Sequence, residues 1–384
     1  MRKSALGLIT LAAASSLLVS ACSSSGSKTT TSSTAGSSSA PAGGSSSSSA
    51  PAAKGKVGVI LPDTTSSTRY TLYDAPLLKK AFDAAGIQSD IQNSGGSTAK
   101  QGSIADSMIG EGVKVILIDS IDATSGAAIE AKAAAAGIQV IDYDRVNLGG
   151  TAPYYVSFDN EEVGKLQAST LVSCLTAAKK TNPQIIEMDG GKDVDNNAVL
   201  FAKGAAEVFD PLQAAGKLKV VSKTTVKGWD KNLAAPAFQQ ALTANGGKVD
   251  GVLAANDDIA NEVITVLKNK GLKVPVTGQD AGISGLQNIL KGDQCMTVFK
   301  DVKQEADAAS KLAIALINKQ DPTTAGNLAD FADPKTPSHK IKALLLKPAV
   351  ITIKNVEDVV TAGSLKASDI CKGIESLCTK NGVK

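Results

Sequence analysis

An acid and a guanidinium follow a short apolar stretch, "GIQVIDY", whose residues are typical of a buried strand. The two side chains are Asp144 and Arg145. A carboxylate accepts hydrogen bonds and a guanidinium donates them, so the pair suits a ligand that carries several hydroxyl groups. The alternative is an ion pair between the two side chains inside the protein.

Polar side chains follow most of the other apolar stretches in the same way. In open parallel sheets, ligands bind beyond the carboxyl ends of the strands, which is where these residues would lie. A single Asp or Asn at such a position also caps a helix or a turn, and a lysine there is often a solvated loop charge. The polar residues are Asp63, Asp119, Asp189, the pair Asn256 and Asp257, the pair Gln279 and Asp280, and Lys300.

Short apolar runs alternate with helical patterns along the chain from residue 56 onward. Two helical patterns end in Gly86 and Gly137, which suits a helix C-terminus. Strands and helices that alternate at this spacing predict an α/β fold, with parallel sheets covered by helices on both faces. Because the strands form two series, we expect two doubly wound lobes. The expected strands are 56–61, 88–93, 113–118, 138–142 and 154–158, then 184–188, 218–223, 249–255, 274–278 and 295–299.

The N-terminal region has the pattern of an export signal followed by a spacer. Residues 1–21 have a basic start and an apolar run too short for a stable spanning helix, and they end in "VSA" before Cys22. The junction resembles a bacterial lipobox, which implies cleavage before Cys22 and a lipid on its sulfur; a free or disulfide-bonded Cys22 is the alternative. Residues 22–53 are almost entirely Ser, Thr, Gly, Ala and Pro, which predicts a disordered tether.

Composition argues against several kinds of site. The formal net charge is +3, so nothing favours nucleic acid as a partner. The stretch "GGSTAKQG" lacks the Gly-Lys-Ser/Thr ending of a phosphate-binding loop, so no cofactor of this kind is expected. His339 is the only histidine and no CxxC spacing occurs, so no metal site is expected.

Four cysteines remain beyond Cys22, and an even number in an exported protein favours disulfides. Cys371 and Cys378 are close in sequence and are expected to pair with each other. Cys174 and Cys295 would then form the second pair.

Several motifs resemble those of the bacterial sugar-binding proteins of ABC importers, the group that shares the ribose-binding fold. The motifs "SFDNEEVG" and "DNNA" are typical of its xylose branch, whereas "NDD" and "GQD" are shared more widely. The resemblance runs through nearly all of the region after the tether. Its matching stretches are 143–145, 154–168, 190–204, 228–245, 254–264, 277–300 and 344–355.

The resemblance implies a periplasmic-binding-protein type I fold, in which two lobes joined by a three-strand hinge close over a monosaccharide. The N-terminal lobe would comprise 54–157 plus about 301–335, and the C-terminal lobe 158–300 plus about 336–384. By position in the motifs, the sugar would be held by Asp144 and Arg145 from the first lobe, by Asn196 or Asn197, Asn256 and Asp280 from the second, by Lys300 near a crossing, and by Trp229 against the ring.

The loop 61–76 departs from the family pattern because it carries a long insert rich in Thr and Ser. Arg69 and Tyr70 are expected to take the place usually filled by a basic and an aromatic residue, and Asp63 lies in the same loop. This loop would form one wall of the site, so it bears on which sugar is bound. The cysteine pair 174 and 295 is a second departure.

The expected function is therefore that of a transport receptor. It would be a monomeric, lipid-anchored binding protein that faces the periplasm or the cell exterior, presents D-xylose or a related sugar to an ABC permease, and needs neither cofactor nor catalysis.

Three alternatives remain. A glycosidase would need a carboxylate pair among Asp189, Asp193 and Asp195, but capping and solvation explain acids in a loop that opens a helix. A receptor for an amino acid would use Arg145 and Asp280 for the two ligand charges. A sugar sensor that signals to a membrane kinase would have the same pocket as a transport receptor.

Overall fold

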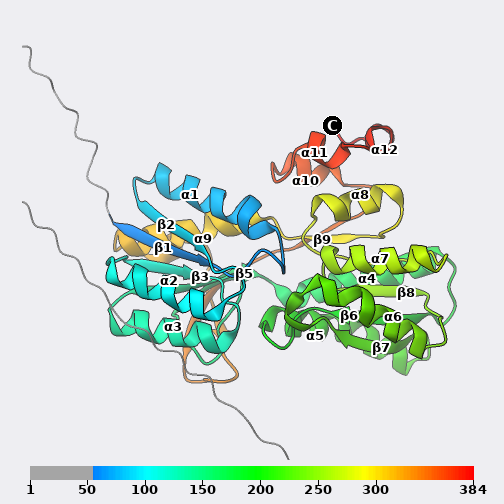
Figure 1. Ribbon diagram of the computed structural model, residues 1–384, viewed down its shortest axis with the longest axis horizontal. Helices are drawn as coiled ribbons and strands as arrows, with labels where there is room; N and C mark the ends of the chain where they lie inside the picture. Colours follow the sequence, from blue (N-terminus) through cyan, green and yellow to red (C-terminus); the bar gives the residue numbers. More distant parts are fainter. Residues whose placement is uncertain (1–54) are drawn as a thin grey trace, which may run out of the picture. The chain divides into compact units, whose positions relative to one another are not determined.

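The computed structural model describes residues 55–384, which form two α/β lobes (Figure 1). The predicted signal segment 1–21, the lipidation site Cys22 and the tether 22–53 lie outside the described residues. No helix within 55–384 is long and apolar enough to cross a membrane. The α/β class predicted from alternating strands and helices is confirmed.

The first lobe is built on a seven-stranded sheet with the order β10-β11-β5-β4-β3-β1-β2. Neighbouring strands run parallel, except that β10 pairs antiparallel with β11 at one edge. All four residues of β3, "VILI", are buried, as expected for a strand covered on both faces. The strands are β1 (Lys56–Leu61), β2 (Gln88–Asn93), β3 (Val115–Ile118), β4 (Gln139–Tyr143), β5 (Tyr154–Phe158), β10 (Ala329–Ala332) and β11 (Lys340–Leu346).

Two pairs of helices cover the two faces of this sheet. α1 (Ala75–Ala84) packs with α9 (Val302–Ile317), and α2 (Thr98–Gly110) packs with α3 (Ala123–Ala135). The α9 segment follows the second lobe in sequence but belongs to the first. The first lobe is therefore assembled from separate parts of the chain.

The second lobe has a three-stranded parallel sheet, β7-β6-β8, and a separate antiparallel pair, β9 with β12. The strand predicted at 274–278 is wrong in extent, because only Val276 forms a bridge, with Val252. Pro275 lacks the N–H that a continuous ladder needs. The strands are β6 (Gln184–Asp189), β7 (Lys219–Thr225), β8 (Gly251–Ala254), β9 (Thr297–Phe299) and β12 (Ala349–Ile351).

Five helices surround the sheet of the second lobe, and two of them cross closely. A Cβ on Gly164 would lie 1.9 Å from the Phe201 carbonyl oxygen, and one on Gly204 would lie 1.9 Å from that of Glu161. The two glycines therefore set the distance between α4 and α5, which fixes where α5 begins beside the cleft. The helices are α4 (Asn160–Ala177), α5 (Asn196–Ala214), α6 (Ala234–Ala244), α7 (Asp257–Asn269) and α8 (Ile283–Lys291).

The chain passes between the lobes three times: from β5 to α4, from β9 to α9, and from β11 to β12. The last crossing falls between Leu346 and Ala349, so the expected return to the second lobe near residue 336 needs correction. The physical reason is that β11 extends the first sheet by pairing with β5, from Lys342 opposite Tyr154 to Leu346 opposite Phe158.

After β12, three short helices pack against α8 and complete the second lobe: α10 (Glu357–Thr361), α11 (Ala367–Cys371) and α12 (Glu375–Asn381). Cys371 and Cys378 are joined here, with their Cα atoms 5.8 Å apart. Cys174 of α4 is joined to Cys295, just before β9, with a Cα separation of 6.6 Å. Both expected cysteine pairs are thus adjacent in the fold.

Candidate functional site

A polar cavity, here called the polar cleft, lies between the two lobes where strands of both sheets end. Its enclosed volume is about 30 Å³, and the whole space including its opening to solvent is about 320 Å³. Its walls come from loops and helix starts that follow strands. The first lobe contributes Ser66, Ser67, Arg69, Tyr70, Asp144 and Arg145, and the second Asp195, Asn197, Phe201, Trp229, Asn256, Gln279, Asp280 and Lys300.

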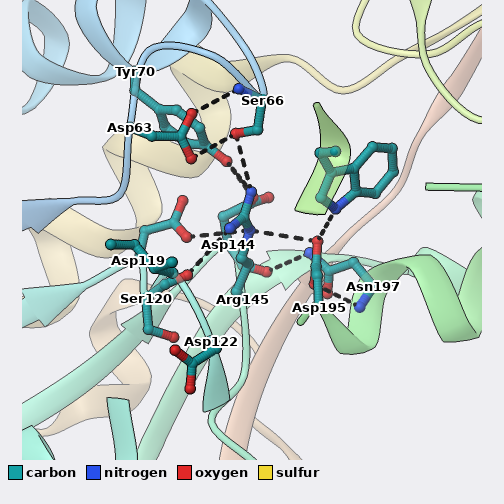
Figure 2. Close-up of polar contacts among 12 residues, drawn as sticks. Asp63, Ser66, Tyr70, Asp119, Ser120, Asp122, Asp144, Arg145, Asp195 and Asn197 are labelled. Carbon is teal, nitrogen blue, oxygen red and sulfur yellow. Dashed lines mark hydrogen bonds and ion pairs between the residues drawn. The ribbon is translucent and has the colours of Figure 1, made fainter. Parts of the chain in front are cut away.

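Asp144 directly follows β4, and its backbone is held by both lobes (Figure 2). Its φ is 61°, a left-handed conformation that a non-glycine residue keeps only where its surroundings enforce it. Its carbonyl oxygen accepts hydrogen bonds from Ser157 Oγ at 2.8 Å, Tyr155 OH at 3.1 Å and Asn197 Nδ2 at 2.9 Å. The backbone is therefore fixed independently of what the carboxylate binds.

The Asp144 carboxylate faces cations and a phenol. Arg69 Nη1 and Lys300 Nζ each lie 3.3 Å from Oδ1, and Tyr70 OH lies 3.3 Å from Oδ2. Burial alone would raise the pKa of Asp144, but Lys300 and Arg69 outweigh it and hold the pKa well below its usual range. These contacts are long for charge-assisted hydrogen bonds, so the carboxylate retains capacity to accept from a ligand.

Arg145 links the two lobes through its guanidinium. Its Nε lies 3.5 Å from Asp119 and 3.4 Å from Asp195, while Nη2 donates to Ser66 Oγ and Tyr70 OH, both at 3.3 Å (Figure 2). Burial raises the pKa of Asp119 well above its ordinary value even though Arg145 lies beside it. The alternative of an internal pair with Asp144 is not found, since no ion pair within 55–384 joins these two side chains.

Arg69 is held by a buried acidic cluster. Its Nε and Nη2 donate to the two oxygens of Asp74 at 3.0 and 2.7 Å, and Nη2 also donates to Glu305 at 2.5 Å. Asp74 ends the π-helical turn η1 (Tyr70–Asp74), and Glu305 lies in the first turn of α9. Asp74 and Glu305 thus hold Nε and Nη2 of Arg69, and Nη1 faces Asp144 and the cleft.

The second lobe presents Asp195, Asn197 and Trp229 across the cleft. Asp195 caps α5 through Asn197 N at 2.8 Å and accepts from Trp229 Nε1 at 3.0 Å. The indole lies directly against Gly190, where an added Cβ would come within 2.0 Å of the ring. Gly190 and Asp195 together fix the plane of the only tryptophan in the chain.

Three loop ends complete the second-lobe wall. Asn256 caps α7 through Ile259 N at 2.9 Å, and its amide group reaches Ser66 O at 3.5 Å. Asp280 has a φ of 96°, and burial raises its pKa although Lys300 partly offsets this. Lys300 follows β9, and its ammonium stays charged because the Asp144 and Asp280 carboxylates outweigh burial and raise its pKa.

Comparison with known proteins places this architecture in a family. Residues 57–321 match the periplasmic binding protein domain. The chain belongs to this family. This periplasmic binding protein is 34% identical over 304 residues to the D-xylose-binding periplasmic protein of Escherichia coli (strain K12). The match covers 77% of this chain and 87% of that protein.

Two further relatives carry sugar-binding descriptions. The multiple sugar-binding periplasmic receptor ChvE of Rhizobium radiobacter is 34% identical over 339 residues, covering 84% of this chain and 93% of the receptor. A carbohydrate transporter solute-binding protein from Chloroflexus aurantiacus, solved in complex with D-glucose, has a TM-score of 0.74 and 31% identity over 82% of this chain and 97% of its own. These relatives are non-enzymatic receptors, and this periplasmic binding protein is not an enzyme.

Most of the predicted ligand residues line the polar cleft of this periplasmic binding protein. Asn196 and Asp63 do not: Asn197 is the asparagine at the cleft, and Asp63 accepts from Thr65 N, Ser66 N and Ser66 Oγ, which shapes its own loop. The residues that line it as expected are Arg69, Tyr70, Asp144, Arg145, Asn197, Trp229, Asn256, Asp280 and Lys300.

Sequence reasoning missed part of the lining. Asp195 stands two residues before Asn197. Because both lie at the start of one helix, the place of Asn197 could have indicated that Asp195 also lines the cleft. Gln279 stands with Asp280 at the same predicted strand end, but only Asp280 was expected to hold the sugar. The serines of the loop and the aromatic ring one turn into α5 gave no signal; they are Ser66, Ser67 and Phe201.

Proposed function

We propose that this chain is the binding protein of an ABC importer and captures a monosaccharide, D-xylose or a related sugar, in the polar cleft. The observation that carries the proposal is the balance of charge in the lining. It contains three cations and three carboxylates, and nearby ionic contacts already join several of them. They are Arg69, Arg145 and Lys300, with Asp144, Asp195 and Asp280.

A neutral polyol fits such a lining better than an ion does. Each sugar hydroxyl both donates and accepts, so it finds carboxylates to donate to and guanidinium or ammonium groups to accept from. A neutral ligand leaves no ion without a partner in a buried site, where an uncompensated charge is costly. The indole of Trp229 offers an aromatic plane for the apolar face of a sugar ring.

The binding of an amino acid is the second candidate, because Arg145 and Asp280 carry the two opposite charges it needs. Arg145 already lies 3.5 Å from Asp119 and 3.4 Å from Asp195, so a ligand carboxylate would compete with these two acids for the guanidinium. A zwitterion would have to displace these partners. The relatives described as sugar-binding also support the first candidate.

Presentation to a permease, lipid anchoring through Cys22 and a monomeric state belong to the same proposal. The anchor rests on the junction "VSAC" and on the Ser-rich stretch that follows it, and the permease on the relatives described as transporter binding proteins. Attachment at residue 22 would hold the protein at the membrane, where the two lobes, which begin at residue 55, could meet the permease. A role in sensing would use the same cleft and differ only in the membrane partner.

Trp229 provides the experiment. It is the only tryptophan of the chain and lines the cleft, so its fluorescence reports on this site alone. Titration with D-xylose, D-glucose, D-ribose and neutral amino acids should change the emission with sugars and leave it unchanged with amino acids. Sugar at about 100 times its dissociation constant should also stabilise the fold by roughly 2.7 kcal/mol. A response to amino acids alone would overturn the proposal.

A further inference from the structure

A second cavity, here called the apolar cavity, adjoins the polar cleft. It has a volume of about 240 Å³ and is lined mainly by hydrophobic side chains. Leu72, Tyr73 and Leu77 enter it from the first lobe, and Phe299, Val359 and Leu365 from the second. None of these six residues has a role in the polar site described above.

Two residues line both cavities: Asp280 and Lys300. The Lys300 ammonium lies 3.3 Å from Asp144 in the polar cleft, and Lys300 also lines the apolar cavity. Asp280 is partly buried and lies at the edge of the cleft. A ligand held in the polar cleft would therefore have the apolar cavity directly beside these two side chains.

The apolar cavity is present although the lobes are already in contact. Asn197 Nδ2 of the second lobe donates to Asp144 O of the first at 2.9 Å, and Arg145 lies 3.4 Å from Asp195. Asp144 and Arg145 are only 4% and 5% exposed. The space between Leu72 and Leu365 is therefore not the gap of a widely open cleft.

The volume and lining of the cavity indicate the chemical class of its occupant. An apolar cavity of about 150 Å³ in another protein holds a benzene ring, so a space of 240 Å³ admits an aromatic ring or a short alkyl chain. A second sugar ring would need hydrogen-bond partners for several hydroxyls. The walls formed by Leu77, Phe299 and Val359 supply none from their side chains. A second sugar could bond only to the polar groups at the rest of the lining, which are Tyr73, Lys80, Lys303, Ser364 and the shared Asp280 and Lys300.

We propose that the apolar cavity binds the aglycone of an aryl or alkyl glycoside whose sugar ring occupies the polar cleft. The inference rests on the proposed function, because the sugar ring anchors the ligand. The site would then accept glycosides with a hydrophobic group as well as free monosaccharides. Binding of the aglycone in this cavity would remove its apolar surface from water. The glycoside would then bind more tightly than the free sugar, in proportion to the apolar area buried.

The test compares D-xylose, methyl β-D-xylopyranoside, phenyl β-D-xylopyranoside and xylobiose by calorimetry, with the corresponding D-glucose compounds as a second series. The phenyl glycoside should bind at least about tenfold more tightly than the methyl glycoside. Equal affinities for the two would overturn the proposal. An equal gain with xylobiose would also overturn it, since the second site would then be polar. Absence of binding by every free sugar would instead refute the proposed function.

A pair of variants separates the two cavities. Leu72 is 57% exposed and has no part in the polar site, so Leu72→Asp should fold normally and bind D-xylose within twofold of the native protein. It should lose most of the preference for the phenyl group, because a carboxylate then faces the ring. Leu233→Asp is the matched control, since Leu233 is 43% exposed and does not line the apolar cavity. If both variants keep the preference for the phenyl over the methyl glycoside, the phenyl group does not bind in the apolar cavity.

Discussion

Asp144 combines a fixed backbone with a loosely held carboxylate, which is the arrangement that a ligand-accepting group needs. Its carbonyl makes hydrogen bonds as short as 2.8 Å, whereas its side-chain contacts with Arg69, Lys300 and Tyr70 are all 3.3 Å. Asp144→Asn keeps the shape and removes the charge. We expect sugar affinity to fall roughly ten- to a hundredfold, the loss of one or two charge-assisted hydrogen bonds.

Asp189→Asn is the control for this measurement. Asp189 also stands at a strand end, but it pairs with Lys192 at 2.6 Å and does not line the polar cleft. Its substitution should leave the titration curve unchanged. If Asp144→Asn binds sugar normally but melts at a much lower temperature, Asp144 serves the fold and not the ligand.

Gly190 determines where the only indole lies. A Cβ at this position would approach the Trp229 ring to 2.0 Å, so Gly190→Ala must displace the ring or the loop. We expect a shifted tryptophan emission and a sugar affinity about tenfold lower, because the aromatic plane no longer matches the ligand. Gly102→Ala, in α2 with nothing within 4 Å of the added methyl group, should change neither.

Motifs and strand ends located most of the polar cleft, and the misses have physical reasons. Asp144, Arg145, Asp280 and Lys300 each follow an apolar stretch, so their place at a sheet edge was readable from the chain. The role of Asp63 was not, because an acid after a strand either caps a turn or meets a ligand, and only the fold decides between the two.

At the scale of the elements, β6 carries an acid that makes stability depend on pH. Glu187 is fully buried in this strand, and Lys223 of β7, 3.3 Å away, is its only ionic partner among the described residues. Burial raises the pKa of Glu187 from about 4.5 to about 7. The folded protein therefore holds more protons than the unfolded chain between these values, and stability falls as the pH rises through this window.

Glu187→Gln should remove this part of the pH dependence. Relative to the variant, the native protein should lose on the order of 3 kcal/mol of unfolding free energy between pH 4.5 and pH 7. Urea unfolding of both proteins at several pH values measures the difference. A constant difference between native and variant across this range would show that the glutamate has an ordinary pKa.

The two cysteine pairs should differ in how much they stabilise the fold. The pair Cys174–Cys295 spans 121 residues of sequence and the pair Cys371–Cys378 spans 7. Loop-closure entropy predicts that the disulfide of the long loop stabilises the fold by about 5 kcal/mol and that of the short loop by about 2.5 kcal/mol. Double serine variants compared by urea unfolding would show the order. Four reactive thiols in the unreduced protein would contradict both disulfides.

Element boundaries were harder to predict than element types. The sequence indicated the strands from 56 to 158 because each is a short apolar run between polar turns. It did not reveal that β11 joins the first sheet, since pairing with β5 is a contact between distant segments. The extent of 274–278 failed for a local reason, the missing N–H of Pro275.

For the whole molecule, the anchoring proposal makes a direct prediction about Cys22. Export of Cys22→Ser should leave the protein unprocessed or release it into the medium, because no thiol remains to carry the lipid. Fractionation of cells with an antibody against the folded part measures this. The matched change Ser23→Ala should leave the protein with the membranes. Membrane association of Cys22→Ser at its mature size would refute the anchor.

The pairing of β11 with β5 also governs the order in which the chain can fold. Residues 340–346 complete the first sheet, yet they leave the ribosome after most of the second lobe, from α4 to β9. Contacts between such distant segments form slowly, and domains assembled from them mature late. A polypeptide threaded through an export channel from its N-terminus thus stays unfolded until almost its whole length has crossed. The same topology means that neither lobe can be produced alone by a single cut in the chain.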